Sequence, residues 1–524
     1  MLGTLHCNAA HIVSGTDEEV MNLLLTKSGI ELGRRICDPE DALTSLALVE
    51  ACIVQIKRAN PYLNAVVATR FTLARQEARS ADLAVTRGRV DPAHVFHGVP
   101  CVVKECFELP GMPYTAGVAG RRGILGSGTA PALQELQLRG VVVLASTNLS
   151  EGCMWHESFN TIYGRSFNPY DFGRTPGGSS GGCGAAVAAC FAPLAVTSDV
   201  GGSTRIPALY NGVFGHKPTG GSISNDGTIP AVGVGEVREY CQLGPMSRHA
   251  DDLWPLLRHM LQQNDGHVTV LQRDNVDAVA QVSLADLTVG FSTRSLGHQL
   301  LLSPLHPEVS TGIHAAVAHL TDVCGCQLGD GFDSIAPEVH EYLNAFQTWG
   351  ALMSRAKQEP FSVTIREHMN PFWGLLGISV EFLWSVIELS PHTLPALLLS
   401  AAEYAVSLTP AQNEQFCAFG ARIRSVLEEK LCQDYVLIIP SVPTPALLHN
   451  ESLIRIFDTA NTSFFNVMEL PSTAVPFGLS AEGLPIGCQI VAGRGQDHLC
   501  IAVATELERV GLAKWVAPRS YIHS

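Results

Sequence analysis

A run of 24 consecutive residues without Asp, Glu, Lys or Arg lies between Arg174 and Asp199, and it constrains the fold of this chain more than any other stretch. The run is rich in glycine and serine. A surface loop of that length would carry charged side chains, and a membrane-spanning helix would be more uniformly apolar. The composition therefore predicts a buried strand and a buried helix, joined by tight turns of the backbone.

Two serine clusters occur in this region, Ser179 and Ser180 within GGSSGG, and Ser203 within DVGGST. Glycines flank both clusters, and glycine lets the backbone take positive φ and approach a ligand closely. We expect a helix over residues 185–190 and a strand over 193–200. Each serine would then lie at the end of a regular element, where a rigid scaffold can hold it.

Strands and helices alternate on either side of this region. The apolar run 96–103 predicts a strand that ends at Lys104, and 141–145 predicts another strand after a helix. Such alternation is typical of a parallel sheet whose faces are covered. The sequence therefore predicts an α/β fold: a large mixed, mostly parallel twisted sheet with helices on both faces.

The composition predicts one large domain over residues 1–524. Hydrophobic residues make up 46% of the chain and charged residues 16%, which is enough to bury a sizeable core. No stretch rich in Pro, Ser or charge divides the chain. Within the single domain we expect a catalytic core over about 90–250 and a helical apolar insertion over about 335–410.

Charge and cysteine usage limit the partners and the compartment. A formal net charge of −15 without a basic tract argues against binding to nucleic acid or to an anionic membrane. The 15 cysteines are scattered through apolar segments, as reduced thiols in the cytoplasm would be. The first 20 residues do not resemble a signal peptide, and no window predicts a transmembrane helix. We expect a cytoplasmic protein that is soluble or peripheral on an intracellular membrane.

The segments GGSSGGCGAAVAAC and SDVGGSTRIPALYNGVFGHKPT resemble the signature of the amidase signature family of serine hydrolases, and the similarity extends over most of the chain. Among its members the chain most resembles fatty-acid amide hydrolases, particularly the second animal type. The resemblance implies the amidase-signature fold. It also implies hydrolysis of a carboxamide C–N bond by a Ser-Ser-Lys triad through an acyl-enzyme.

Residue by residue, the resemblance assigns a role to several positions. The triad would be Lys104, Ser179 with a cis peptide bond, and the nucleophile Ser203. The backbone N–H groups of the oxyanion hole would be those of Val200, Gly201, Gly202 and Ser203. Supporting positions are Ser180, as a hydrogen-bond partner of the lysine, and Asp199 with Arg205, which are either a functional charge pair around the turn or ordinary structural ions. Burial at a strand end should lower the pKa of Lys104 and so make it a base.

The resemblance also points to a substrate class. Cys153 and Met154 lie where fatty-acid amide hydrolases line the acyl pocket, so we expect a fatty acyl amide or N-acylethanolamine as the small lipid substrate. The apolar segment 371–408 is either a buried helical pair or a surface cap in peripheral contact with a membrane. Cys183 stands where such enzymes often have glutamate, and at the start of a helix it should matter little. The oligomeric state, including a homodimer, stays open.

Several alternatives remain beside this interpretation. Gly177–Gly181 fits the G-x-S-x-G pattern of a nucleophile elbow, although the preceding residues make a poor strand. His156 and His216 are available as bases for such a triad. Other functions are a general amidase of small or peptide amides, a glutamine amidotransferase subunit, and an inactive scaffold. No metal motif stands out, since the CGC at 324–326 is isolated, and we expect no cofactor.

Overall fold

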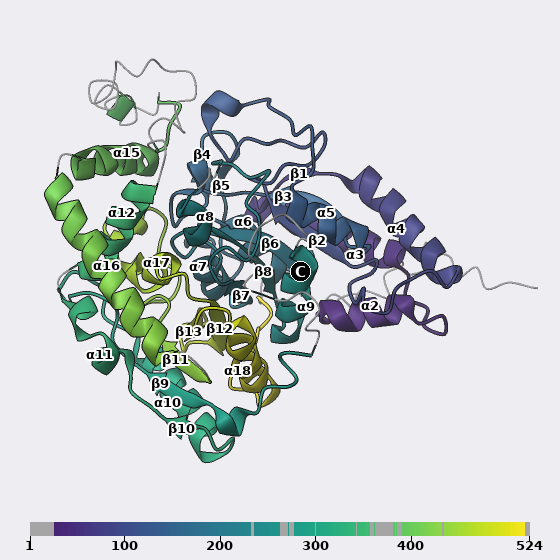
Figure 1. Ribbon diagram of the computed structural model, residues 1–524. Helices are drawn as coiled ribbons and strands as arrows, with labels where there is room; N and C mark the ends of the chain where they lie inside the picture. The colour runs from purple at the N-terminus through teal and green to yellow at the C-terminus, as the bar shows by residue number, and fades with distance from the viewer. Residues whose placement is uncertain are drawn as a thin grey trace, which may run out of the picture.

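The computed structural model describes residues 26–231, 235–261, 271, 277–298, 300–341, 343–356, 361, 381–382, 384, 390–407, 409–431 and 434–518. In this part of the chain an 11-stranded sheet runs through the molecule, with helices packed around it (Figure 1). The predicted α/β class and large mixed sheet are therefore confirmed. Part of the apolar segment 371–408, namely residues 371–380, 383, 385–389 and 408, lies outside the described residues.

The sheet has the strand order β1-β3-β2-β6-β8-β7-β12-β13-β11-β9-β10. In chain order the strands are β1 (Val66–Thr69), β2 (Pro100–Lys104), β3 (Val142–Thr147), β6 (Leu194–Asp199), β7 (Phe214–Lys217), β8 (Gln242–Ser247), β9 (Thr288–Phe291), β10 (Gln327–Leu328), β11 (Tyr435–Ile439), β12 (Ser472–Leu479) and β13 (Pro485–Ala492). A separate hairpin pairs β4 (Phe159–Asn160) with β5 (Gly164–Arg165).

Parallel pairing is less common in the described sheet than the sequence predicts. Four neighbouring pairs are parallel: β2 with β3, β2 with β6, β9 with β11, and β9 with β10. Six are antiparallel, because β1, β8, β7, β12 and β13 run against their neighbours. The expectation of a mostly parallel sheet is therefore wrong. It followed from the segments that form β2 and β3, which are parallel neighbours joined through a helix.

The described helices are α2 (Gly29–Cys37), α3 (Ser45–Leu63), α4 (Phe71–Thr86), α5 (Pro131–Leu138), α6 (Gly181–Ala188), α7 (Arg205–Tyr210), α8 (Val237–Tyr240), α9 (Leu253–Met260), α10 (Pro307–Asp322), α11 (Phe332–Ile335), α12 (Asn344–Ala356), α15 (Leu394–Ser407), α16 (Pro410–Lys430), α17 (Ala460–Val467) and α18 (Asp497–Arg509). Helix α6 packs on β2, β6 and β8, while α18 packs on β12 and β13. None of the helices in the described ranges is both long and apolar enough to cross a bilayer.

The central strands are covered on both faces. Every residue of β2, β3 and β6 is buried, and successive side chains in a strand point to opposite faces. Each of these strands therefore packs on both sides, which explains their nearly continuous apolar sequences. A second cluster of buried side chains joins α12, α16 and α17 beside the sheet. Helix α15 packs on α12 and α16 at the edge of this cluster (Figure 1).

Candidate active site

The predicted site residues meet at one edge of the sheet. Strands β2, β3 and β6 are parallel neighbours, so their carboxyl ends lie at the same edge. Lys104 is the last residue of β2, and the turn that carries Ser203 follows β6 directly. Ser179 lies just before α6, which packs on these two strands. Segments about 75 residues apart in sequence are thus brought together at the crevice where open α/β sheets bind their ligands.

The Lys104 ammonium contacts two hydroxyl groups. Its Nζ donates to Ser179 Oγ at 2.6 Å and to Ser198 Oγ at 2.9 Å, and the Lys104 side chain is fully buried. The sequence predicts a bond from this lysine to Ser180, but the Ser180 hydroxyl instead donates to the carbonyl oxygen of Ser198 at 3.4 Å. Ser180 therefore acts on the lysine only through the strand that carries Ser198.

Opposing effects set the pKa of Lys104. Burial lowers it, as the sequence predicts, but negative charge on neighbouring thiols raises it, with Cys153 the largest such effect. With all these thiols counted, the pKa of Lys104 lies above its ordinary value, so the predicted net direction is wrong. A thiol favours the ammonium only as a thiolate, and burial raises the pKa of Cys183 and Cys241 to about 12. At neutral pH these two thiols are uncharged.

Cys153 is therefore the thiol whose charge affects the pKa of Lys104 most. Burial raises the pKa of Cys153, but hydrogen bonding from Cys106 and the charge of Lys104 more than offset this, and the pKa falls below its ordinary value. The Cys153 thiol also lies 3.5 Å from the carbonyl oxygen of Ile229, to which it donates. Protonation of Cys153 removes the largest effect that raises the pKa of Lys104.

The turn after β6 is built on a fully buried ion pair. Arg205 Nη2 lies 3.0 Å from Asp199 Oδ1, and Arg205 Nε lies 3.0 Å from Oδ2. Asn466 donates to Asp199 and accepts from Arg205. Burial raises the pKa of Asp199, but the Arg205 charge and these hydrogen bonds hold it well below its usual range. The expected charge pair is present, and it fixes both ends of the turn.

The amide groups of the turn differ in what they bind. The N–H of Gly202 donates to Asp199 Oδ1 at 2.7 Å, so it is already satisfied, and the expectation that it serves the oxyanion hole does not fit this structure. Gly202 also has φ of +114°, and a Cβ there would collide with Thr462. Within the described residues the amides of Val200, Gly201 and Ser203 make no hydrogen bond, and all three residues line a cavity.

Ser203 is the more accessible of the two candidate triad serines. It keeps 8% of its surface exposed, whereas Ser179 is fully buried. In the described part of the chain Ser203 Oγ has no hydrogen-bond partner, and no bond joins it to Ser179 Oγ. The two segments are held together by the Ser180 amide, which donates to the Ser203 carbonyl at 3.2 Å. The predicted cis peptide bond is present between Gly178 and Ser179.

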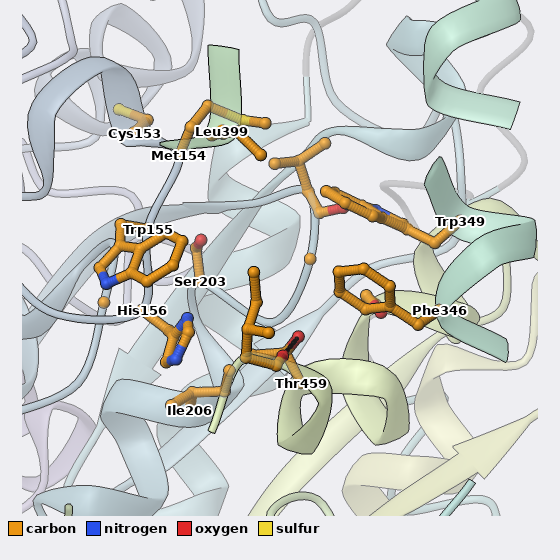
Figure 2. Close-up of a pocket in the computed structure, with 15 residues that line it drawn as sticks. Cys153, Met154, Trp155, His156, Ser203, Ile206, Phe346, Trp349, Leu399 and Thr459 are labelled. Atoms are coloured by element: carbon orange, nitrogen blue, oxygen red, sulfur yellow. Dashed lines mark hydrogen bonds between the residues drawn. The ribbon is translucent and has the colours of Figure 1, made fainter. Parts of the chain in front are cut away.

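The Ser203 hydroxyl faces a cavity with two unlike sides (Figure 2). Trp155 and His156 lie on one side, and Phe346 and Trp349 from α12 lie on the other. Met154 and Leu399, from the 146–169 loop and from α15, lie close together at one end. Cys153 also lines the cavity, so both residues predicted to bind the acyl group are beside Ser203. Most of the lining is apolar.

A buried carboxylate fastens the 146–169 loop to the start of α15. Glu151 Oε1 lies 2.7 Å from His392 Nδ1, and Glu151 Oε2 accepts from the Thr393 amide at 2.6 Å. Glu151 opens the short 3₁₀ helix that ends at Cys153. The cavity wall supplied by this loop and the wall supplied by α15 are therefore joined directly.

The nucleophile-elbow alternative does not fit the structure. Residues 166–178 form turns and bends, so no strand leads into Ser179. The two ring nitrogens of His216 are hydrogen-bonded to Thr473 and Asp497. His156 lines the cavity but makes no hydrogen bond to Ser179 or Ser203 among the described residues. Cys183 is buried in α6 against Thr147, as its place at a helix start predicts, and it does not line the cavity.

Several residues of the site could not be found by sequence reasoning, or carry only a weak signal. Ser198 resembles an ordinary strand residue, although a hydroxyl five positions before Ser203, on the strand that leads to it, is a usable signal. Phe346 and Trp349 come from a helix about 145 residues further along the chain, and no local pattern links them to the turn. Glu151 belongs to a segment without clear periodicity. Its role depends on His392, 241 residues away.

The chain is similar to known proteins in sequence and in structure. The Amidase family model matches residues 47–501. The chain is 36% identical to fatty-acid amide hydrolase 2 of Homo sapiens, with 97% of this chain and 93% of the relative covered. It is 28% identical to a glutamyl-tRNA(Gln) amidotransferase subunit of Renibacterium salmoninarum, with 95% and 96% covered. A solved fatty acid amide hydrolase superposes with a TM-score of 0.73 at 18% identity, covering 97% of this chain and 89% of that one, which shows a shared fold.

Proposed function

Because the chain belongs to the amidase signature family and is an amide-hydrolysing enzyme, we propose that it cleaves carboxamides through an acyl-enzyme formed on Ser203. The bond from Lys104 Nζ to Ser179 Oγ at 2.6 Å is the observation that carries this proposal. In this proposal the buried Lys104 amine and the Ser179 hydroxyl act in series behind Ser203, whose hydroxyl faces the cavity. A nucleophile needs such a base to accept its proton.

The proton path follows from these contacts. Ser203 Oγ attacks the acyl carbon, its proton passes to Ser179, and the Ser179 proton passes to a neutral Lys104. The amides of Val200, Gly201 and Ser203 then stabilise the oxyanion, and each such donor is worth about 3–4 kcal/mol. The proton returns through Ser179 to the leaving nitrogen, and water completes the cycle. The Ser179–Ser203 bond forms when substrate binds, since hydrogen bonds of this kind are often long in free enzymes.

Labelling with a fluorophosphonate probe tests the nucleophile. The wild-type protein should be labelled, and Ser203→Ala should not. Ser463→Ala removes another hydroxyl that lines the same cavity, and this control should still be labelled. Labelling of Ser203→Ala at the wild-type level would end the assignment of Ser203.

The substrate proposed for this site is a fatty acyl amide or an N-acylethanolamine, which yields a free fatty acid and an amine. Two observations support it: the apolar side chains of Met154, Phe346, Trp349 and Leu399 around the cavity, and the 36% identity to fatty-acid amide hydrolase 2. A glutamine site would instead need charged or polar groups for the α-amino and α-carboxyl groups. The apolar lining thus favours a lipid over the amidotransferase alternative.

The acyl-length profile separates a lipid amidase from a general amidase. Each buried methylene contributes about 0.8 kcal/mol, so kcat/KM should rise steeply from short to long acyl ethanolamides. Met154→Trp should shorten the preferred chain, because it fills the end of the cavity formed with Leu399. A flat profile would favour a general amidase. Activity on glutamine alone would favour the amidotransferase.

We also propose peripheral contact with a membrane near α15. Leu398 is 39% exposed, while its neighbour Leu399 lines the cavity, so α15 separates the cavity from the surface. Phe382 and Trp384 are 40% and 50% exposed, and Ser390 bonds Glu381, which ties this segment to the residues before α15. Exposed aromatic and aliphatic side chains suit an apolar membrane interface.

A further inference from the structure

Three metal-ligating side chains meet far from the candidate active site, between α10 and α18. His319 lies in the last turn of α10, Cys324 follows that helix, and Glu506 lies in α18, 182 residues after Cys324. Both helices pack on β13 and are neighbours at one end of the sheet (Figure 1). Their donor atoms lie within 4.8 Å of one another. Cys324 belongs to the CGC motif, which the proposed function leaves unexplained.

The distances between the donor atoms resemble those of a tetrahedral site. Cys324 Sγ lies 3.3 Å from His319 Nε2 and 3.5 Å from Glu506 Oε1. His319 Nε2 and Glu506 Oε1 are 2.8 Å apart. Zinc bond lengths imply separations of about 3.6 Å for the sulfur pairs and about 3.4 Å between nitrogen and oxygen. To bind zinc, only the distance between His319 Nε2 and Glu506 Oε1 has to increase appreciably. The His319 and Glu506 side chains are 12% and 10% exposed.

We propose that His319, Cys324 and Glu506 bind a zinc ion, with water as the fourth ligand. A thiolate and an imidazole favour zinc over magnesium or calcium, which prefer oxygen ligands. The ion replaces the hydrogens that His319 and Cys324 now direct at Glu506 Oε1. One proton leaves the Cys324 thiol for solvent, and the proton of the neutral His319 imidazole moves from Nε2 to Nδ1, which frees Nε2 for the metal. Zinc then fastens the end of α10 to α18.

Arg509 competes with the cation for the carboxylate. Its Nε donates to Glu506 Oε2 at 2.7 Å, and its Nη2 donates to Oε1 at 2.9 Å. Together with His319 and Cys324, this guanidinium lowers the pKa of Glu506 to about 2, so the carboxylate is ionised and ready to coordinate. With zinc on Oε1, Arg509 Nη2 loses its bond to that oxygen, and only the bond from Nε to Oε2 remains.

Cobalt(II) is the first probe, because a thiolate ligand gives it a near-ultraviolet charge-transfer band. Metal-free wild-type protein titrated with Co²⁺ should develop this band with the strong visible absorption of a tetrahedral site, and Zn²⁺ should displace it. Cys324→Ser should abolish the band. Cys326→Ser is the matched control, since the Cys326 thiol, two residues away, donates to the Leu284 carbonyl at 3.0 Å and should leave the band intact. An unchanged spectrum in Cys324→Ser, or no thiolate band in the wild type, would overturn the proposal.

Zinc affinity and thermal stability give a second readout that does not depend on catalysis. Zn²⁺ should raise the Tm of the wild type and of Cys326→Ser but not that of Cys324→Ser. Loss of the thiolate ligand should weaken Zn²⁺ binding by at least about 100-fold. Arg509→Gln should tighten binding by about tenfold, because it removes a competing positive charge. Unchanged or weaker binding in Arg509→Gln would contradict the placement of the ion on Glu506 Oε1.

Discussion

The indole N–H of Trp349 donates to the carbonyl oxygen of Val200 at 2.8 Å, which joins α12 to the turn before Ser203. In a planar trans peptide the carbonyl and the next N–H point in opposite directions. By holding the Val200 carbonyl, Trp349 therefore also orients the N–H of Gly201. A helix that lines the cavity thus positions a candidate oxyanion donor.

Trp349→Phe should lower kcat by about five- to tenfold, since the hydrogen bond it removes is worth about 1 kcal/mol. Steady-state kinetics with a long acyl amide would measure this. Phe346→Leu changes the same side of the cavity without a bond to the turn, so it should mainly raise KM. Equal effects of both variants on kcat would mean that Trp349 only fills space.

Ser198 should matter more to catalysis than Ser180. Ser198→Ala removes a hydrogen bond to the Lys104 ammonium, which is worth about 1.5–3 kcal/mol, so kcat should fall by about 10- to 100-fold. Ser180→Ala removes a 3.4 Å bond to a backbone carbonyl and should cost less than about threefold. The reverse order would restore Ser180 as the partner of the lysine.

The pH–rate profile should report on Cys153. The Cys153 charge is the largest effect that raises the pKa of Lys104, so Cys153→Ser should lower that pKa. Because the reaction needs neutral Lys104, the rise of kcat/KM with pH should then shift to lower pH. Cys183→Ser is the control, since burial raises the pKa of Cys183 to about 12 and keeps it uncharged across the range. An unshifted profile in Cys153→Ser would show that its thiol does not influence the base.

Arg205→Met should destabilise the fold severely. The substitution leaves the Asp199 carboxylate buried without its partner, which costs about 3–5 kcal/mol in the free energy of unfolding. Chemical denaturation would measure it. Lys27→Met breaks the exposed pair with Glu31 and should cost at most about 1 kcal/mol. A similar loss of stability in the two variants would mean that the buried Asp199–Arg205 pair contributes no more to the free energy of unfolding than an exposed ion pair.

Trp384→Glu should weaken sedimentation with neutral phosphatidylcholine liposomes, because Trp384 is half exposed and a charge opposes insertion. Hydrolysis of a short, water-soluble amide should be unaffected. Tyr62→Glu is a suitable control, since Tyr62 is 63% exposed on α3, far from α15 in the chain. Liposome binding that is equally strong in both variants and the wild type would exclude a membrane role for this segment.

The residues that could be predicted are those whose position depends on local sequence. Lys104 ends a strongly apolar strand, and Ser179 and Ser203 lie in glycine-rich turns next to such elements, so their positions at the ends of elements followed from the pattern. Their proposed roles came from the resemblance to the amidase signature family. Their convergence followed from the parallel pairing of β2 and β6. The strands that pair antiparallel, β1, β7, β8, β12 and β13, carry no comparable pattern, and their directions were not predicted.

What could not be predicted depends on distant partners. Whether an amide is free for a ligand is decided by the neighbouring carboxylate, as with Gly202 and Asp199, and sequence does not reveal the direction of a peptide plane. The pKa of Lys104 depends on thiols from four separate segments. Cys324 could not be linked to Glu506 without the packing of α10 and α18 on β13.

The attachment of Glu151 to His392 and Thr393 has a thermodynamic consequence. The loop that carries Met154 cannot shift without moving the start of α15, so the cavity and the surface beside Leu398 share one conformational equilibrium. Linkage between two such sites is reciprocal. If contact with a lipid surface tightens substrate binding by some factor, bound substrate must tighten that contact by the same factor, and product release must loosen it. Through the Glu151 contacts, the effect of a lipid surface on substrate binding and the effect of substrate on binding to that surface should therefore give the same coupling free energy.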